Sequence, residues 1–435
     1  TAPTLTVRIC GGLSCALAGA SGLMAEIQRL NARTDVRIIQ APCVGRCEQA
    51  PVAVVHQRPV AQAKPQDVMQ HIAAQSRWPE LGKDGAQFDP VSKALGDVVS
   101  PEDRLQTVVD VVDLDTYRAQ GGYRVWLQLQ SGERSREAVL SAMEDSGLRG
   151  LGGAGFPAGR KWRIVASKPG PRLLAVNLDE GEPGTFKDRT YLERDPHRFL
   201  EGLLVATEVV GIDTVYIYLR DEYHACRLLL ERELKRLAEW SHRRLPRIEL
   251  RRGAGAYVCG EESAMIESLE GKRGEPRMRP PYIADVGLFG KPTLAHNFET
   301  LYWVRDIVER GPQWFKGFGR HGRTGLRSFS LSGRVRKPGV KLAPAGITVR
   351  ELIDEYGGGM LPGHAFYAYL PGGASGGILP ASLGDVPLDF DTLQAHGCFI
   401  GSAAVIVLSD QDRASEAALN LSLIHISEPT RPERI

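Results

Sequence analysis

The sequence has 435 residues, 43% of them hydrophobic and 24% charged, which is the balance of a globular protein with enough apolar material for a large core. Its 54 lysine and arginine residues against 52 aspartate and glutamate residues leave a formal charge of +2, so charge gives no reason to expect a nucleic acid or an anionic membrane as partner. The sequence contains no run near the ~18 apolar residues of a membrane span and does not start like a secretory signal, so we expect a cytoplasmic protein without membrane insertion, in which disulfides are disfavoured.

The N-terminal part of the sequence predicts a small α/β domain. Its expected elements are a strand at 4–10, a helix at 19–31 and further strands at 35–40 and 51–55. A polar stretch with proline and glycine follows from about residue 76, which is typical of a connector between domains. We therefore assign residues 1–76 to the first domain and residues 77–130 to a connector.

Four of the seven cysteines lie in two loops of this first domain. They are Cys10, Cys15, Cys43 and Cys47. Four residues separate the first pair and three the second, and both loops are rich in small residues, which let the backbone approach the sulfurs. Thiolates at such spacing are typical ligands of iron–sulfur clusters or zinc. A [2Fe–2S] cluster is the interpretation we favour, and a zinc ion or four buried cysteines without a ligand remain as alternatives.

Strands and helices alternate in the middle of the chain. Strands are expected at 173–177, 215–219 and 248–251, and helices at 199–210 and 223–239. This alternation predicts an α/β fold with a largely parallel sheet covered by helices. Short strands and turns replace the pattern from about residue 326 and lead to an apolar run at 403–408. We therefore assign residues 131–325 to a central domain and residues 326–410 to a separate small α+β domain.

A glycine-rich segment at 147–162 is the first candidate binding element of the central domain. It has six glycines in thirteen positions, which suits a backbone that must approach a bulky ligand and direct its N–H groups at phosphate or ribose oxygens. Lys161 would add a positive charge, and Phe156 an apolar face for a nicotinamide or adenine ring. The segment follows no expected strand and precedes no obvious helix, so an ordinary dinucleotide-binding fold is disfavoured and a plain flexible loop is the alternative.

Polar side chains follow the strand expected at 173–177. Asn177, Asp179 and Glu180 lie where open α/β sheets bind ligands, and they suit ribityl hydroxyls or ring nitrogens better than a phosphate. A solvated turn is the alternative. Further along, Gly260 precedes Glu261 and Glu262 at the start of an expected helix, whose dipole would stabilise both carboxylates. Paired carboxylates also suit hydrolysis, but neither a nucleophile nor a water-activating metal site accompanies them.

Together these segments resemble the flavin-binding subunit of respiratory complex I and its relatives in NAD-linked formate dehydrogenases and hydrogenases. The resemblance covers most of the chain, and five motifs carry it in order: the glycine-rich segment, 179–189, 255–262, 276–281 and 291–300. It implies a Rossmann-like FMN- and NAD-binding central domain. It also implies a thioredoxin-like [2Fe–2S] domain before it and a ubiquitin-like domain, the soluble-ligand-binding β-grasp, after it.

The resemblance also implies the cofactor-binding residues. FMN would be held by Gly150, Gly152, Gly153, Lys161, Asn177, Asp179, Glu180, Tyr257, Gly260, Glu261, Asn297 and Thr300. The dinucleotide would stack near Phe156, and the residues that complete its site would be Glu182, Glu262, Arg279 and Tyr282. His296 stands where relatives carry an asparagine beside the flavin, although a lone histidine is as often packed in a core. No side chain is expected to act as a catalytic nucleophile, because the flavin supplies the chemistry.

The activity implied is hydride exchange between NAD(H) and FMN, with single electrons passing to or from iron–sulfur clusters. His296 and the segment 298–306 are most similar to the formate dehydrogenase branch. The implied partners are therefore a molybdenum- or tungsten-containing formate dehydrogenase catalytic subunit and a small [2Fe–2S] subunit. The alternatives are the equivalent subunit of an NAD-linked hydrogenase or of complex I, and a self-contained NAD dehydrogenase.

The resemblance further implies a C-terminal helical bundle with four cysteines for a [4Fe–4S] cluster. Residues 411–435 are expected to begin this bundle, but the residues after Asn420 carry no cysteine and no helical apolar stripe. We therefore expect a truncated or frame-altered end, without the ligands of that cluster. The remaining Cys226, Cys259 and Cys398 are isolated in the sequence and are expected to be packed rather than ligating.

Overall fold

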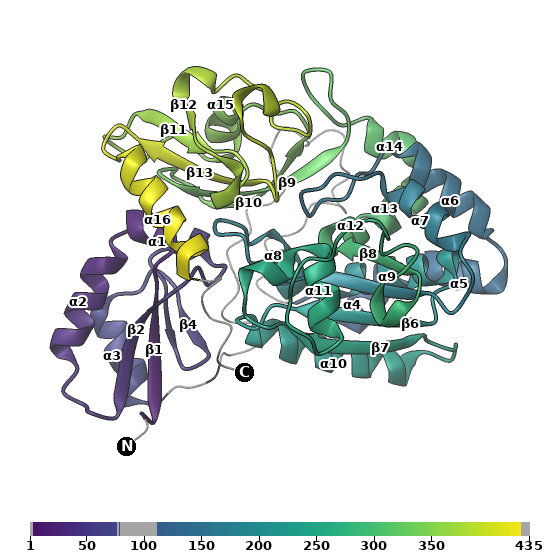
Figure 1. Ribbon diagram of the computed structural model, residues 1–435, viewed down its shortest axis with the longest axis horizontal. Helices are drawn as coiled ribbons and strands as arrows, with labels where there is room; N and C mark the ends of the chain where they lie inside the picture. The colour runs from purple at the N-terminus through teal and green to yellow at the C-terminus, as the bar shows by residue number, and fades with distance from the viewer. Residues whose placement is uncertain (1–2, 76–77, 79–110, 428–435) are drawn as a thin grey trace.

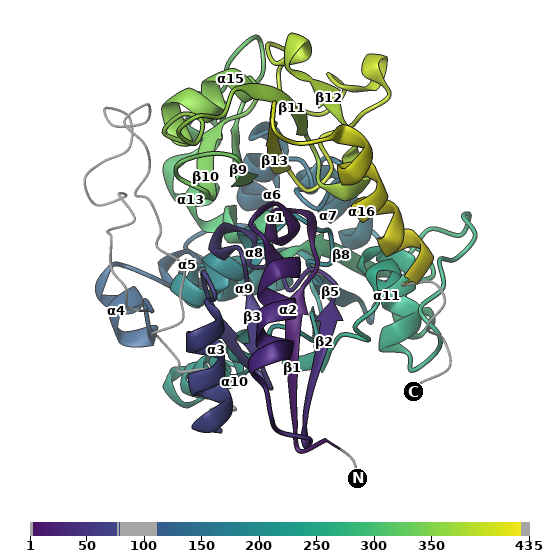
Figure 2. The ribbon, with the colours of Figure 1, turned by 90° about the vertical axis from the view of Figure 1, so that its left-hand side faces the viewer.

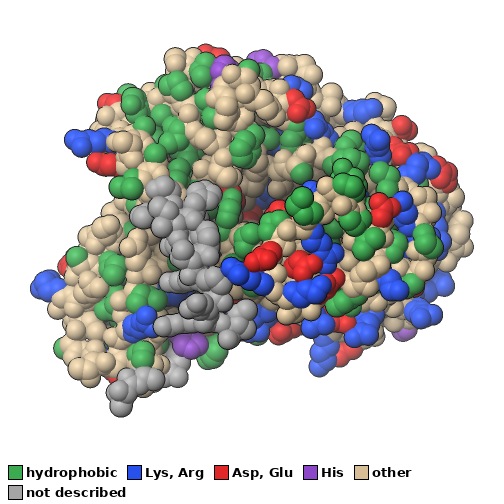
Figure 3. Space-filling model, in the orientation of Figure 1, with side chains coloured by type: hydrophobic (Ala, Val, Ile, Leu, Met, Phe, Trp, Pro, Cys, Tyr) green, Lys and Arg blue, Asp and Glu red, His purple; other side chains and the backbone are tan. Residues whose placement is uncertain are grey.

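The computed structural model describes residues 3–75, 78 and 111–427. These residues form three sheets, one in each of the regions expected from the sequence (Figure 1). None of the helices in the described residues combines the length and the apolar character needed to cross a membrane. On the face shown in Figure 3, acidic and basic side chains are interspersed over the helices of the central sheet.

The N-terminal sheet has the order β2-β1-β3-β4. Its strands are β1 (Leu5–Cys10), β2 (Val36–Ala41), β3 (Ala53–Val55) and β4 (Arg58–Val60), and its helices are α1 (Leu13–Leu17), α2 (Ala20–Leu30) and α3 (Pro65–Ala73). Strand β1 runs parallel to β2 and antiparallel to β3. Alternate residues of β1, from Leu5 through Val7 to Ile9, are buried, so the apolar alternation that predicted this strand also builds the core. The expected strands and the expected helix at 19–31 are confirmed.

The central sheet has the order β7-β6-β5-β8 and is parallel throughout. Its strands are β5 (Leu173–Leu178), β6 (Thr214–Leu219), β7 (Arg247–Arg252) and β8 (Thr293–Asn297). The helices around it are α6 (Arg136–Asp145), α7 (Ala158–Ala166), α8 (Lys187–Arg194), α9 (Pro196–Val210), α10 (His224–Trp240), α11 (Glu262–Leu269), α12 (Phe298–Tyr302), α13 (Val304–Arg310) and α14 (Pro312–Lys316).

Both faces of the central sheet are covered. On β5, Leu174 and Val176 share an apolar core with α9 and α10, whereas Leu173 and Ala175 pack with α11 on the opposite face. A strand that is buried on both faces reads as a continuous apolar run, which is why the sequence predicted a parallel sheet here. The predicted α/β architecture is confirmed.

The expected connector at 77–130 is only partly described, because residues 79–110 lie outside the described residues. Its last part is helical rather than linking, with α4 (Leu114–Ala119) and α5 (Arg124–Ser131) packed on α9. The carboxylate of Glu201 in α9 accepts hydrogen bonds from the Tyr117 hydroxyl at 2.6 Å and from the Tyr123 N–H at 2.8 Å. This end of the expected connector therefore belongs to the core of the central domain. Helices α4 and α5 were not predicted from the sequence, because a short helix that contributes only a few apolar side chains has no extended periodic pattern.

The third sheet has the order β10-β9-β13-β11-β12. Its strands are β9 (Leu326–Gly333), β10 (Gly339–Pro344), β11 (Phe366–Leu370), β12 (Leu379–Pro380) and β13 (Ala404–Ser409), and α15 (Val349–Glu351) packs against it. Strand β13 is parallel to β9, while the other pairs are antiparallel. This mixed five-stranded sheet is the α+β unit expected from the sequence, and we call it the small domain.

Helix α16 (Ala414–Ser427) leads from the small domain to the N-terminal domain, where it lies beside α1 (Figures 1 and 2). The Asn420 side-chain amide donates to the carbonyl of Gly11 at 3.1 Å, and Ala417 and Leu421 share an apolar cluster with Leu13. The helix continues to Ser427, although the sequence has no helical apolar stripe beyond Asn420.

Candidate cofactor-binding sites

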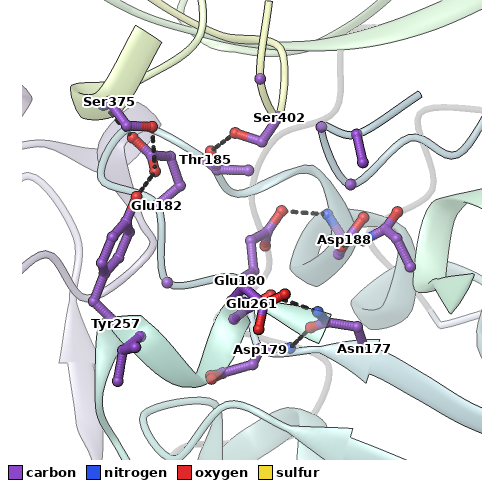
Figure 4. Close-up of a pocket in the computed structure, with 18 of the residues that line it drawn as sticks. Asn177, Asp179, Glu180, Glu182, Thr185, Asp188, Tyr257, Glu261, Ser375 and Ser402 are labelled. Atoms are coloured by element: carbon purple, nitrogen blue, oxygen red, sulfur yellow. Dashed lines mark hydrogen bonds between the residues drawn. The ribbon is translucent and has the colours of Figure 1, made fainter. Parts of the chain in front are cut away.

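A cavity of about 590 Å³ lies at the carboxyl ends of β5 and β8 (Figure 4). The strand register pairs Asn177 with Asn297 at these ends, and both side chains line the cavity. Strands β6 and β7 follow β5 on one side, while β8 lies on its other side, so the strand order reverses between β5 and β8. Open parallel sheets bind ligands at such a point, and the volume falls within the roughly 300–1,000 Å³ of small-molecule sites.

The structure brings most of the expected FMN-binding residues to this cavity. The expected residues that line it are Gly152, Gly153, Asn177, Asp179, Glu180, Glu182, Tyr257, Gly260, Glu261 and Asn297. Those outside its lining are Gly150, Phe156, Lys161, Glu262, Arg279, Tyr282, His296 and Thr300. Lining residues to which the sequence gave no role are Ala154, Gly181, Thr185, Lys187, Asp188, Val258, Pro276, Ser375, Phe399, Gly401 and Ser402.

Two hydrogen bonds hold the glycine-rich segment in one shape. The N–H of Gly150 donates to the carbonyl of Phe156 at 2.8 Å, and the N–H of Leu151 donates to the Thr300 hydroxyl at 2.9 Å. Gly153 has a φ of +120°, which residues with a side chain rarely adopt. Gly150 and Thr300 therefore hold the conformation of the segment without lining the cavity, whereas Gly153 lines the cavity with its backbone.

The glycine-rich segment lies between two helices, since it follows α6 and leads directly into α7. The expectation that no strand precedes it is confirmed, but the expectation that no helix follows it is wrong. The helix was not expected because Gly159, a residue that usually weakens helices, lies in the first turn of α7. A Cβ at this position would lie 2.4 Å from the backbone nitrogen of Glu144, so the glycine allows close packing of α7 on α6 rather than ending a helix.

Lys161, Glu262 and His296 lie next to the cavity without lining it. The Lys161 ammonium pairs with Glu262 at 3.3 Å and donates to the Ala295 carbonyl at 3.1 Å. His296 is buried, and its Nε2 accepts a hydrogen bond from the Trp162 indole at 2.7 Å. Burial, together with the Lys161 charge, lowers the pKa of His296 and keeps the ring neutral. The structure shows His296 packed in the core, one of the two alternatives left by the sequence, and the flavin contact stays a prediction.

Asn177 and Asp179 form the acidic end of β5. The Asn177 amide donates to the Gly260 carbonyl at 2.8 Å, and its oxygen accepts from the Asp179 N–H at 3.1 Å. Asp179 is buried, and its Oδ2 has no hydrogen-bond partner among the described residues. Burial raises the pKa of Asp179 to about 7, although the Arg220 charge opposes this rise. An unpaired carboxyl oxygen in a cavity wall suits a bound ligand that donates a hydrogen bond.

The carboxylate of Glu180 accepts its hydrogen bonds from other residues of the protein. Its carboxylate accepts from the N–H groups of Asp188 at 2.8 Å and Arg189 at 3.1 Å, at the N-terminus of α8, and from the Tyr223 hydroxyl at 2.9 Å. Burial and the neighbouring Asp188 charge raise the pKa of Glu180 to about 7. Glu180 therefore shapes the cavity wall by anchoring α8, a role that sequence reasoning did not assign to it.

A buried lysine is the main feature that sequence reasoning missed. The Lys187 ammonium pairs with Asp188 at 2.7 Å and with Glu299 at 3.0 Å, and Asp188 also accepts from the Asn297 amide at 2.6 Å. Burial opposes the Lys187 charge, but the surrounding carboxylates outweigh it and raise the pKa of this lysine. Its motif was recognised in the sequence, but no periodic pattern distinguishes a buried lysine from an exposed one.

Glu182 connects the acidic turn to the small domain (Figure 4). Its carboxylate accepts a hydrogen bond from the Tyr257 hydroxyl and two from Ser375, whose N–H lies at 2.7 Å and whose hydroxyl lies at 3.0 Å. The hydroxyls of Thr185 and Ser402 meet at 2.5 Å nearby. One wall of the cavity thus comes from the small domain, which sequence reasoning treated as separate because about two hundred residues lie between the two segments.

Glu261 is the N-cap of α11 and accepts from the N–H groups of Ser263 at 2.8 Å and Ala264 at 2.9 Å. The Arg279 guanidinium also contacts its carboxylate. Arg279 and Tyr282 both lie outside the cavity lining, and Tyr282 is 60% exposed. The expected helix start is confirmed, and its carboxylate has the structural role that the helix dipole predicts.

The four N-terminal cysteines are buried and close together. Contacts with Cys15 and Cys43 raise the pKa of the Cys10 thiol, and the sulfurs of Cys43 and Cys47 lie 3.4 Å apart. A Cβ at Gly12 would lie 3.0 Å from the Cys43 Cβ, so this glycine leaves room at the sulfurs. Within the described residues, no three metal-binding side chains are spaced to hold one ion. A two-iron cluster instead needs four thiolates divided between two irons, which these paired loops provide.

The other three cysteines, Cys226, Cys259 and Cys398, are each buried in a different apolar core. Burial raises the pKa of Cys226, Cys259 and Cys398 alike. The expectation that these cysteines are packed is confirmed, and the expectation that they bind no metal stays a prediction.

Three family models match the chain, one in each region. Residues 143–306 match the Nuo51 FMN-binding domain, residues 2–76 the thioredoxin-like [2Fe-2S] ferredoxin, and residues 329–379 the SLBB domain. The three matches fall on the central sheet, the N-terminal sheet and the small domain, in that order.

Curated relatives and solved structures give a consistent picture. The chain is 46% identical to the second F-type subunit of NADH-quinone oxidoreductase from Rhizobium meliloti over 69% of this chain and 74% of that protein. It is 40% identical to the F-type subunit of NADH-quinone oxidoreductase from Aquifex aeolicus over 72% of this chain and 73% of that protein. A chain of an air-oxidized NAD+-reducing [NiFe]-hydrogenase is 30% identical with a TM-score of 0.76, and the match covers 96% of this chain and 71% of that one.

Proposed function

This chain belongs to the family of F-type subunits of NADH-quinone oxidoreductase, and from this premise we propose that it exchanges hydride between NAD(H) and FMN and single electrons with iron–sulfur clusters. Its cofactors are FMN, NAD and a [2Fe–2S] cluster. FMN, when bound, accepts two electrons as a hydride and releases them singly, which none of the side chains of the described cavity can do.

The cavity at the β5–β8 edge is the observation that carries this proposal. Its size suits a flavin mononucleotide, Gly153 leaves its backbone bare, and Asp179 offers an unpaired buried oxygen. We assign the flavin to this cavity, with Asn177 and Asn297 as further polar contacts at the strand ends. Groups fixed before the ligand arrives lower the entropic cost of binding it.

We assign the nicotinamide side of the cavity to Glu182, which accepts a hydrogen bond from the Tyr257 hydroxyl. Glu182 is held by donors from two domains, so its carboxylate has little freedom to turn away. Phe156 is 38% exposed beside the cavity and offers an apolar face for a ring of the dinucleotide. In this assignment the protein aligns two rings and excludes water, while no side chain acts as a nucleophile.

The partner we propose is a molybdenum- or tungsten-containing formate dehydrogenase subunit, accompanied by a small [2Fe–2S] subunit. His296 and the segment 298–306 support this choice by their similarity to that branch. The hydrogenase match favours a second candidate, because it extends over the N-terminal domain and the small domain as well as the central one. A cytoplasmic location remains a prediction.

Two measurements test the proposed function. The purified chain is expected to carry FMN, and anaerobic addition of NADH is expected to bleach the visible flavin absorption. A protein that binds NAD but never flavin would refute the assignment. The native complex is then assayed for NAD+ reduction with formate and with hydrogen. Reduction with formate alone supports the formate partner, whereas reduction with hydrogen alone selects the second candidate.

A further inference from the structure

The cluster loop, residues 43–48, is docked on the central domain by three buried arginines. Arg46 of the loop pairs with Glu193 at 2.7 Å, and the Arg189 side chain donates to the Gly45 carbonyl at 2.9 Å and pairs with Glu48. Arg220, at the end of β6, donates to the carbonyl of Cys43. The loop therefore meets the central domain through directed polar contacts that fix its orientation.

The Arg220 side chain contacts both the cluster loop and a residue that lines the flavin cavity. The Arg220 guanidinium donates to the Glu180 carbonyl at 2.6 Å as well as to the Cys43 carbonyl. Glu180 lines the cavity, and Cys43 is one of the four thiol ligands assigned to the cluster. Arg220 is 5% exposed, so water screens its charge poorly.

The carboxylates around Arg220 differ from those around Arg46 and Arg189. Arg46 and Arg189 face the two carboxylates of Glu48 and Glu193, so that group is neutral as a whole. Arg220 pairs with Glu222 at 3.0 Å, and the Glu222 side chain is 27% exposed. Glu222 and Asp179 both oppose the Arg220 charge, but it is the Arg220 guanidinium that contacts Cys43.

A close fit between Tyr223 and Gly45 accompanies this contact. A Cβ at Gly45 would lie 2.3 Å from the Tyr223 hydroxyl oxygen, and Gly45 has a φ of +70°. The same hydroxyl donates to the Glu180 carboxylate at 2.9 Å. The loop and the cavity wall are thus fitted to one another without space for a side chain between them.

We propose that Arg220 is a positioning residue that fixes the cluster loop to the flavin cavity wall and raises the reduction potential of the [2Fe–2S] cluster. This inference rests on the proposed electron-transfer function. A hydride from NADH would bring two electrons to the flavin, and the cluster would accept and pass on one electron at a time, twice for each NADH, with no bond formed or broken at the cluster. Because the reduced cluster is more negative by one charge, a nearby guanidinium stabilises it relative to the oxidised form.

The test is the midpoint potential of the cluster in the full chain. It is measured in a dithionite titration that is monitored by electron paramagnetic resonance. For Arg220→Gln we expect a roughly tenfold shift of the one-electron equilibrium toward the oxidised cluster, which is about 59 mV to lower potential. Arg220→Lys keeps the positive charge and is expected to shift the midpoint potential less. The matched control is the double variant Arg46→Gln with Glu193→Gln, which removes both charges of one ion pair of the same interface, keeps its net charge and is expected to leave the potential unchanged.

Glu222→Gln provides an independent variant, because it removes the counter-charge and leaves Arg220 in place. This variant is expected to raise the potential of the cluster. Its measurement remains possible even if the Arg220→Gln protein loses its iron. A wild-type potential in Arg220→Gln with full iron content, or a lowered potential in Glu222→Gln, overturns the proposal. Flavin bleaching by NADH is recorded on the same samples. Its absence would refute the proposed function, while the dithionite titration still decides the role of Arg220.

Discussion

Ser375 donates two hydrogen bonds to Glu182, one from its N–H at 2.7 Å and one from its hydroxyl at 3.0 Å. These bonds join the small domain to the acidic turn of the central domain, inside the cavity assigned to FMN and NAD(H). The small domain is therefore part of the wall of this cavity, and the hydroxyl of Ser375 gives a direct way to measure its contribution.

Ser375→Ala removes one of the two bonds and leaves the backbone donor. If Glu182 orients the dinucleotide, KM for NADH with an artificial electron acceptor should rise about 2- to 10-fold, since one such bond is worth about 0.5–1.5 kcal/mol. The FMN content should not change. Ser402→Ala serves as control, because its hydroxyl bonds the neutral Thr185 on the same wall. An equal rise in both variants would indicate a general loss of packing.

Gly153→Ala tests the glycine cradle. An alanine there must adopt a φ of +120°, and its Cβ would lie 3.4 Å from the Gly401 carbonyl carbon. Such backbone strain costs about 1–3 kcal/mol, so we expect FMN affinity to fall about 10-fold or more in fluorescence titrations. Gly150→Ala is the matched control, because its Cβ would make only an ordinary contact 3.6 Å from the Phe156 carbonyl oxygen. Similar losses in both variants would exclude a specific role for Gly153.

Asp179→Asn tests the unpaired carboxyl group. Its pKa of about 7 in the folded chain lies above the ordinary 3.8, so between these values the folded state binds more protons than the unfolded state. Stability that Asp179 contributes is therefore complete below 3.8 and is lost as the pH rises to about 7. The full effect is roughly 3–5 kcal/mol at about 1.4 kcal/mol per pH unit.

For Asp179→Asn we accordingly expect a flatter dependence of urea unfolding on pH in the flavin-free chain. The variant should be more stable than the parent at neutral pH and should bind FMN more weakly. Unchanged pH dependence would show that Asp179 is ionised and paired in solution.

His296→Asn tests whether this histidine contacts the flavin. The structure predicts full FMN content and a loss of about 1–3 kcal/mol of stability, because the Trp162 indole N–H loses its acceptor. The folded chain holds the pKa of His296 below the ordinary 6.5, so its contribution is present above 6.5 and is lost as the pH falls below that value. Thermal unfolding and flavin quantification decide the matter, and loss of flavin at unchanged stability would restore the sequence-based expectation.

Cys15→Ser tests the cluster independently of the flavin. Removal of one of four thiolate ligands is expected to abolish most of the iron and sulfide in the purified chain while the FMN content remains, since no cysteine lines the flavin cavity in the described residues. Zinc in place of iron in the unchanged chain would revive the alternative that the cysteine spacing left open.

The main elements were predictable because their signals are local. The apolar run of β5 and the glutamates at the start of α11 are read directly from adjacent residues. The roles of Glu180 and Lys187 were not predictable, because both depend on partners that only the folded chain brings near. The packing of His296 was not predictable for the same reason. Its position at the end of β8 is readable from the sequence, but the indole that fixes its ring lies on α7.

The contact between Asn420 and Gly11 has a consequence for how electrons leave the cavity. Helix α16 holds the cysteine-bearing domain at Gly11, whereas the arginine contacts hold it at residues 43–48, so that domain is attached through two separate segments. A redox centre held in this manner receives electrons from a donor in the same molecule. The rate of this transfer does not depend on protein concentration. Dilution is therefore expected to leave electron delivery to the cysteine-bearing domain unchanged, whereas delivery onward to a separate subunit should weaken as that subunit dissociates.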